Sequence, residues 1–203
     1  MATKDHSLDE GIVRAAYAEF LEHGFQKASI HKISERAGVT TGAIYTRYKN
    51  KDALFTSLLQ DFLAAYQALF APAAAEYERA RTSRSVADLC AAIRFEEELY
   101  IRLLLERGDD CTLFFSRSDG SSIEVMLGDA MEMKTRQTVQ FFRDVYGREA
   151  NAHAIRLLMS SQFWYFRQLL DARLGQAEML ECLKQVLEFS NAGWKQFCEA
   201  LLC

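Results

Sequence analysis

The chain has 203 residues, half of them hydrophobic, with a formal net charge of −4, one proline and ten glycines. This apolar content is enough for a substantial core, and the scarcity of proline and glycine favours long helices, so we predict an all-α protein. No run of eighteen apolar residues could cross a membrane, and the first ten residues lack the apolar core of a secretory signal, so we expect a cytoplasmic protein.

The charge is unevenly distributed along the chain. Residues 1–51 carry eight Lys or Arg and six Asp or Glu, whereas residues 52–203 carry sixteen and twenty-two. A positively charged N-terminal part followed by an acidic remainder is what a DNA-reading domain on an acidic body would show. The excess is small, so it predicts a moderate, salt-dependent affinity.

An amphipathic helix is predicted before Gly24. Ile12 and Phe20 lie on its apolar face, and Gly24 marks its end. We expect this helix to pack against the segment that follows, with Glu19 and Glu22 facing away from phosphate. The histidines in this part of the chain do not repeat at i, i+3 or i, i+4 spacing, so no metal site is predicted.

Two short helices joined by a tight turn are predicted over residues 29–52. Ser29 is a typical N-cap, Gly38 supplies the left-handed residue that ends the first helix, and Thr40 or Thr41 can cap the second. This spacing is that of a helix-turn-helix, whose second helix enters the major groove of DNA. A small helical hairpin without DNA contacts is the alternative. The exposed face of the second helix offers donors and no carboxylate, at Thr41, Gly42, Tyr45, Thr46 and Arg47.

About fifty residues resemble the N-terminal domain of the TetR/AcrR family of bacterial transcriptional repressors, over the blocks GFQKASIHKISER and AGVTTGAIYTRYKNKDALF. The resemblance implies a homodimeric repressor of all-helical fold, in which a small molecule bound in the C-terminal domain lowers affinity for a palindromic operator. It divides the chain into a helix-turn-helix DNA-binding domain, residues 1–51, and a helical ligand-binding and dimerisation domain, residues 52–203. It implies no cofactor and no catalytic residue.

The resemblance also assigns residues to DNA. It places four near bases or backbone, Thr40, Thr41, Ala43 and Thr46, and three at phosphates, Tyr45, Arg47 and Lys51. To these we add Ser29, His31 and Gly42 as predicted DNA contacts. The end of the recognition helix departs from the family's usual tyrosine, histidine or phenylalanine choices, with Thr46, Arg47 and Tyr48, so the operator sequence cannot be transferred from a relative.

The rest of the chain is predicted to form long helices. A helix that starts at Asn50 and ends or kinks before Pro72 would link the two domains as a rod of about 30 Å. A charged segment, 76–84, precedes the next helix, and residues 109–122 are expected to form a short helical or irregular connection with an apolar anchor at Leu113, Phe114 and Phe115. Further helices are expected over residues 85–107, 123–146, 151–174 and 176–202.

Candidate ligand contacts lie on the apolar stripes of these helices. A carboxylate on such a stripe costs several kcal/mol to bury unless it is paired, so Glu97 lies either at the bundle edge or against a cation from the protein or a ligand. Gln137 and Gln162 could hydrogen-bond a ligand, and the methionines would suit an adaptable pocket. An ordinary methionine-rich core is the alternative. The candidates are Phe95, Glu97, Tyr100, Met126, Met133, Gln137, Gln162 and Phe163.

The last two helices present more apolar surface than one chain would cover. The first is apolar nearly all round over residues 163–166, and the second carries Leu180, Leu187 and Trp194 at seven-residue spacing. The economical solution is a four-helix bundle made by two chains, whose recognition helices would read half-sites about one helical turn apart. The predicted interface residues are Phe166, Leu180, Leu183, Leu187, Trp194 and Phe197.

The five cysteines form no C-x-x-C pair and show no ligand spacing with a histidine. They are therefore predicted to be reduced packing residues. A thiol sensor is the alternative, for which Cys111 in a polar loop and the near-terminal Cys203 are expected to be the most exposed.

Three classes of function follow. The main hypothesis is a ligand-responsive repressor that binds a palindromic operator as a homodimer and leaves DNA when a small molecule binds its C-terminal domain. An enzyme on a helical scaffold is not supported, because the chain has no Glu-x-x-His pair, nucleophile motif or glycine-rich phosphate loop. The third is a helical small-molecule-binding protein that no longer reads DNA.

Overall fold

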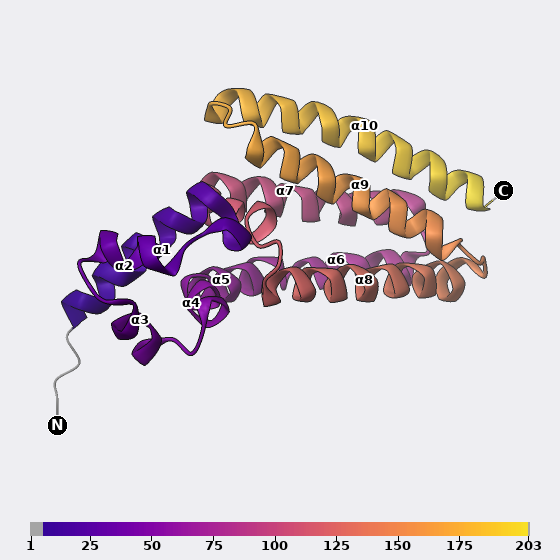
Figure 1. The fold of residues 1–203 in the computed structure, drawn as a ribbon. Helices are drawn as coiled ribbons and strands as arrows, with labels where there is room; N and C mark the ends of the chain where they lie inside the picture. The colour runs from indigo at the N-terminus through magenta and orange to yellow at the C-terminus, as the bar shows by residue number, and fades with distance from the viewer. Residues whose placement is uncertain (1–5, 203) are drawn as a thin grey trace. The chain divides into compact units, whose positions relative to one another are not determined.

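In the computed structural model, the part of the chain that is described runs from residue 6 to residue 202. Helices make up almost all of this part and it contains no strand, which confirms the all-α prediction (Figure 1). None of these helices combines the length and apolar character that spanning a membrane would require.

The chain divides into two compact units. We call the first unit the head; it comprises residues up to Ala64 together with Asp109–Met126. The second unit, the body, comprises Ala65–Gly108 and the residues from Leu127 onward. Residues 109–126 therefore pack with the N-terminal helices, which the sequence did not lead us to expect. The division into a DNA-binding domain, residues 1–51, and a ligand-binding and dimerisation domain, residues 52–203, stays a prediction.

The head is built on α1 (His6–Lys27), α2 (Ile30–Ala37), α3 (Thr41–Arg47) and α4 (Lys51–Leu58). Its core consists of side chains with almost no exposed surface, among them Ile12, Phe20, Ile33, Ile44 and Phe55. The rings of Phe20 and Phe55 pack edge to face with centroids 4.9 Å apart. The predicted apolar stripe of the first helix is thus the face that holds the two short helices.

The helix expected from Asn50 to Pro72 is broken. It consists of α4 and α5 (Gln60–Phe70), separated at Leu59, whose φ and ψ of −102° and 1° are not helical. The hydroxyls of Thr56 and Ser57 donate to the carbonyls of Asp52 and Leu54 at 2.8 and 2.7 Å. Such back-bonding bends helices, which accounts for the break. The predicted end before Pro72 is confirmed.

The connection after α7 (Val86–Cys111) carries the expected apolar anchor. It forms one turn of π-helix, η1 (Thr112–Ser116), in which Leu113, Phe114 and Phe115 are buried in the head. The Phe25 amide donates to the Arg117 carbonyl at 2.7 Å, so this segment is tied to the end of α1. Cys111 is completely buried here, so its predicted exposure is wrong. Cys203 lies outside the described residues.

The body is formed by α6 (Ala73–Ser83), α7 (Val86–Cys111), α8 (Ser122–Tyr146), α9 (Ala152–Asp171) and α10 (Gln176–Leu202). The segment 76–84, for which no element was predicted, is helical because Ala73 and Ala80, seven residues apart, are buried on one face. A core cluster includes Phe141, Phe142, Ile155, Trp194 and Cys198.

Candidate functional site

The turn between α2 and α3 has the geometry that its sequence predicts. Gly38 adopts a left-handed conformation with φ of 69°, and the Val39 amide donates to the Ser34 carbonyl at 3.0 Å, which closes the end of α2. The Thr40 hydroxyl oxygen accepts the Ala43 amide at 3.2 Å and so begins α3. These caps fix α3 next to α2 in the manner of a helix-turn-helix.

The outward face of α3 is polar and free of carboxylates. His31, Thr40, Gly42, Tyr45 and Thr46 are exposed, and Tyr45 keeps 52% of its surface accessible. Ser29, Thr41 and Ala43 lie half-buried beside them. No hydrogen bond within the described residues engages the Tyr45 hydroxyl. Eight of the ten predicted DNA contacts therefore lie on or beside one accessible surface.

Arg47 and Lys51, the other two predicted DNA contacts, are engaged within the head. The Arg47 guanidinium pairs with Asp9 on α1 and donates to the Ala43 carbonyl at 3.1 Å. The Lys51 ammonium donates to the carbonyls of Gln26 and Ala28 at 3.2 and 2.9 Å, near the end of α1, and burial lowers its pKa. Both side chains hold helices of the head together, so a phosphate contact would require these bonds to open.

Two other lysines are better placed for phosphate. Lys32, in the first turn of α2, and Lys49, just after α3, are exposed, and their side chains form no hydrogen bond or ion pair within the described chain. The sequence offered a signal for both, because each follows closely on a cap of a helix-turn-helix element. They were missed as site residues since position in the sequence does not reveal which cation is already paired.

Glu19 joins α1 to α2 from inside the head. It is completely buried, and its Oε1 accepts the Ser29 amide at 3.1 Å. Its Oε2 has no hydrogen-bond partner but lies 3.4 Å from Nη1 of Arg36 at the other end of α2. Glu22 is exposed and accepts from the same guanidinium at 3.2 Å. Glu19 thus faces α2 from within the head, whereas its predicted position away from phosphate stays a prediction.

Comparison with known proteins identifies the head. A family profile described as "Bacterial regulatory proteins, tetR family" matches residues 12–58, which hold α2, α3 and their caps. The head therefore resembles the tetR family of bacterial regulatory proteins. The structure of the chain also resembles that of a TetR-like transcriptional regulator from Rhodococcus sp. RHA1, with a TM-score of 0.57 and 14% identity over 92% of this chain and 96% of that one.

Curated proteins that are similar to this chain match it over a short segment. The probable acrEF/envCD operon repressor of Escherichia coli K12 is 38% identical over 47 residues, 23% of this chain and 21% of that protein. The fatty acid metabolism regulator protein of Bacillus subtilis 168 is 33% identical over 55 residues, 27% and 28% of the two chains. The matched segments therefore cover less than a third of the length of each of these relatives.

A second structural neighbour extends the likeness in fold to the body. NalD of Pseudomonas aeruginosa, named as the secondary repressor of the MexAB-OprM multidrug efflux pump, aligns with a TM-score of 0.51 and 22% identity. The alignment covers 90% of this chain and 97% of NalD. The body thus shares the fold of these solved structures at a low sequence identity.

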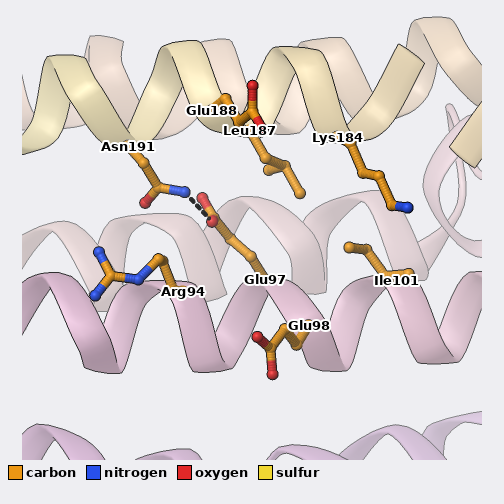
Figure 2. A pocket seen from close by; sticks show the side chains of 8 residues that line it. All are labelled: Arg94, Glu97, Glu98, Ile101, Lys184, Leu187, Glu188 and Asn191. Carbon is orange, nitrogen blue, oxygen red and sulfur yellow. Dashed lines mark hydrogen bonds between the residues drawn. The ribbon is translucent and has the colours of Figure 1, made fainter. Parts of the chain in front are cut away.

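The body has a recess between α7 and α10, of about 170 Å³ (Figure 2). Glu97 points from α7 toward α10, where its Oε2 accepts the Asn191 amide at 2.6 Å. Its Oε1 is buried and has no hydrogen-bond partner in the described chain. Burial raises the pKa of Glu97 to about 6, against the Asn191 hydrogen bond, which lowers it. The other lining side chains are Arg94, Glu98, Ile101, Lys184, Leu187 and Glu188.

The remaining predicted ligand contacts do not line this recess. Tyr100 meets the Tyr66 hydroxyl at 3.1 Å and packs on Phe70 and Phe166. Gln162 donates to Ser190 on α10 at 2.7 Å. The other candidates are half-buried, Phe95 and Phe163, or exposed, Met126, Met133 and Gln137. Met126 also belongs to the head. A common ligand cavity for this set stays a prediction.

The predicted dimer residues mostly face the chain's own core. Phe166, Leu183 and Trp194 are buried, Phe197 packs on the core cluster, and Leu180 and Leu187 are half-buried. The most exposed large apolar side chains of α9 and α10 among the described residues are Leu157, Trp164 and Phe189, at 72%, 57% and 74% of their surface. The predicted interface is corrected accordingly, since Phe166, Leu183 and Trp194 are already covered by neighbouring helices.

The raised pKa of Glu97 leads to a prediction about stability. The folded chain holds this proton more tightly than the unfolded chain, whose carboxyl titrates near 4.5, so stability falls as pH rises from about 4.5 through 6 and does not recover above it. Glu97→Gln removes this loss. After discounting for partial exposure, we expect the variant to gain about 1 kcal/mol over the wild type between pH 4 and pH 8.

Urea unfolding of both proteins at the two pH values measures this gain. The matched control is Glu98→Gln, which removes the same charge from an exposed position on the same helix. Its free energy of unfolding should change between pH 4 and pH 8 by the same amount as that of the wild type. If Glu97→Gln also changes by the same amount as the wild type, then Glu97 titrates as an ordinary solvated carboxyl.

Proposed function

We propose that the chain is a ligand-responsive transcriptional repressor that binds a palindromic operator as a homodimer. The observation that carries this proposal is the accessible, carboxylate-free face of α3 within a capped helix-turn-helix. Tyr45 and Thr46 lie where side chains can reach base edges or backbone, and Lys32 and Lys49 lie where they can neutralise phosphates. The similar proteins named as repressors in Escherichia coli and Pseudomonas aeruginosa support the same direction of regulation.

Dimerisation through α9 and α10 completes this proposal. The two helices pack against each other, and Leu157 and Trp164 lie seven residues apart on one face of α9. We group these two side chains with the exposed Phe189 of α10 and call the three together the α9–α10 face. Fully burying such side chains stabilises an assembly by about 1.5–3 kcal/mol each. A second copy of the chain would cover this face by an isologous contact and supply the second recognition helix.

The effector is proposed to bind in the body. Ligand binding would change the equilibrium between a state that fits the operator and one that does not, with a coupling of about 1–3 kcal/mol. The aromatic side chains around Tyr100 and the recess at Glu97 are the two parts of the body with polar groups among apolar ones. We expect a compound that weakens operator binding to change the fluorescence of Trp164 or Trp194, the two tryptophans of the body.

Selection of genomic fragments by the purified protein, with footprinting of the enriched sites, tests the proposal. We expect an inverted repeat. Tyr45→Ala and Lys49→Ala should each weaken binding about tenfold, and Lys49→Ala should reduce the slope of log K against log salt by about 0.9. Lys195→Ala, which removes an exposed lysine from α10, is the matched control and should leave both quantities unchanged.

Two outcomes would count against DNA reading. One is the absence of any enriched fragment in moderate salt. The other is equal loss of affinity in the Lys49 and Lys195 variants, which would indicate attraction by net charge alone. Either result would favour a helical small-molecule-binding protein that has kept the fold.

A further inference from the structure

The recess between α7 and α10 contains an incompletely satisfied carboxylate. Glu97 Oε2 accepts one hydrogen bond, from Asn191, whereas Oε1 is shielded from solvent and accepts none within the described residues. An ionised oxygen in that position loses its hydration without gaining a donor. A group that supplies a donor and a positive charge at this point would therefore be held more strongly than at an exposed carboxylate.

The chain's own cations do not fill this role. Arg94 and Lys184 line the recess, but both side chains are exposed and neither forms an ion pair with Glu97 in the described structure. Figure 2 places their charged ends on either side of the carboxylate rather than on it. The lining as a whole has three acidic and two basic side chains, an excess of one negative charge.

We propose that this recess binds a small organic cation, a primary ammonium with a short apolar tail. The ammonium donates to Glu97 Oε1, and the tail lies against Ile101 and Leu187, the two apolar side chains of the lining. A volume of about 170 Å³ is below the 300–1,000 Å³ of pockets for drug-sized ligands, so the ligand has only a few heavy atoms. This recess is one of the two parts of the body proposed above for the effector, but binding of the cation itself does not require DNA.

The recess lies away from the α9–α10 face. Leu187 and Asn191 each stand two residues from Phe189 along α10, which turns them about 200° around the helix axis from it. Covering Phe189 by a second copy of the chain would therefore leave this side of α10 open. A bound cation and a dimer can coexist.

The probe that tests this site is n-butylammonium, with butan-1-ol as the uncharged analogue of similar shape. The readout is the side-chain amide NMR signal of Asn191, followed during titration of the full-length chain at pH 7.5. We expect saturable shifts at millimolar concentration for the ammonium and none for the alcohol. Glu97→Gln should weaken binding about tenfold or more, the loss expected for one charge-assisted hydrogen bond.

The matched control is Glu106→Gln, which removes the same charge from an exposed position on α7 outside the recess and should bind the probe within about twofold of the wild type. Equal weakening by both variants would show that only the net charge of the surface matters, and would overturn the site. So would equal shifts with butan-1-ol, or no saturable shift with the ammonium. Because no DNA is present, failure here is distinct from failure of the proposed repressor function.

Discussion

Replacing Glu19 with alanine is expected to lower the free energy of unfolding by about 3 kcal/mol. The substitution removes the carboxylate oxygen that accepts the Ser29 amide at the start of α2 and the buried charge that faces Arg36 near the end of α2. It also leaves a cavity at a completely buried position of α1. Since both ends of α2 depend on this one side chain, we expect α2 to lose its fixed position on α1.

Two further variants separate the parts of this effect in urea unfolding. Glu19→Gln keeps an oxygen that can accept the Ser29 amide but loses the charge, so we expect a smaller loss, about 1 kcal/mol. Glu22→Ala is the matched control, because Glu22 pairs with the same Arg36 from an exposed position one turn further along α1. It should leave the unfolding midpoint nearly unchanged, as exposed ion pairs contribute little.

Operator affinity gives a second readout, measured at a temperature at which all three proteins are folded. Glu19→Ala should weaken binding to a selected fragment. The turn that positions α3 continues from α2, so a change in the position of α2 also moves α3. Glu19→Gln should restore most of the affinity. If Glu19→Ala has the same unfolding midpoint and the same operator affinity as Glu22→Ala, then the buried carboxylate has no part in holding the head together.

The helix-turn-helix could be predicted from sequence because its determinants are local. Gly38 takes a conformation that only glycine adopts cheaply, and Ser29 and Thr40 cap helices through contacts three residues away. The buried positions Ile33 and Ile44 follow from helical spacing. In each case the residues that decide the structure lie within one or two turns of each other.

The roles of charged side chains could not be predicted in the same way. Arg47 pairs with Asp9, 38 positions away, and Lys51 bonds to carbonyls more than 20 positions away. The burial of Glu19 was not predicted for the same reason, since its partner Ser29 lies beyond the end of α1. Whether a cation is free for phosphate depends on tertiary contacts that a spacing pattern does not contain.

The seven-residue spacing in α10 was informative about which side is apolar but not about what covers it. Trp194 is covered by the chain's own core and Leu187 lines a recess with Glu97. Phe189, between them in sequence, stands outside that repeat and is the most exposed large apolar side chain of the last two helices among the described residues. A heptad pattern fits a helix of an intramolecular bundle as well as a seam between two chains.

Placing glutamate at both Trp164 and Phe189 is expected to convert the proposed dimer to monomers and to weaken operator binding about a hundredfold or more. Two aromatic side chains that are more than half exposed on α9 and α10 would lose their burial against a second copy, and two buried charges would be added in their place. The monomer would hold one recognition helix, so binding of a second half-site would no longer be intramolecular. Sedimentation velocity gives the oligomeric state, and titration of the footprinted operator gives the affinity.

Val125→Glu is the matched control for the oligomeric state, because Val125 is an apolar side chain with 63% of its surface exposed, on α8 rather than on the α9–α10 face. It should sediment like the wild type. If the double variant also remains a dimer, the α9–α10 face does not form the interface, and another exposed surface must bring the two heads together. If the variant is monomeric yet binds the operator as tightly as the wild type, then a single head supplies all of the affinity, and the palindromic arrangement of the site would need a different explanation from paired recognition helices.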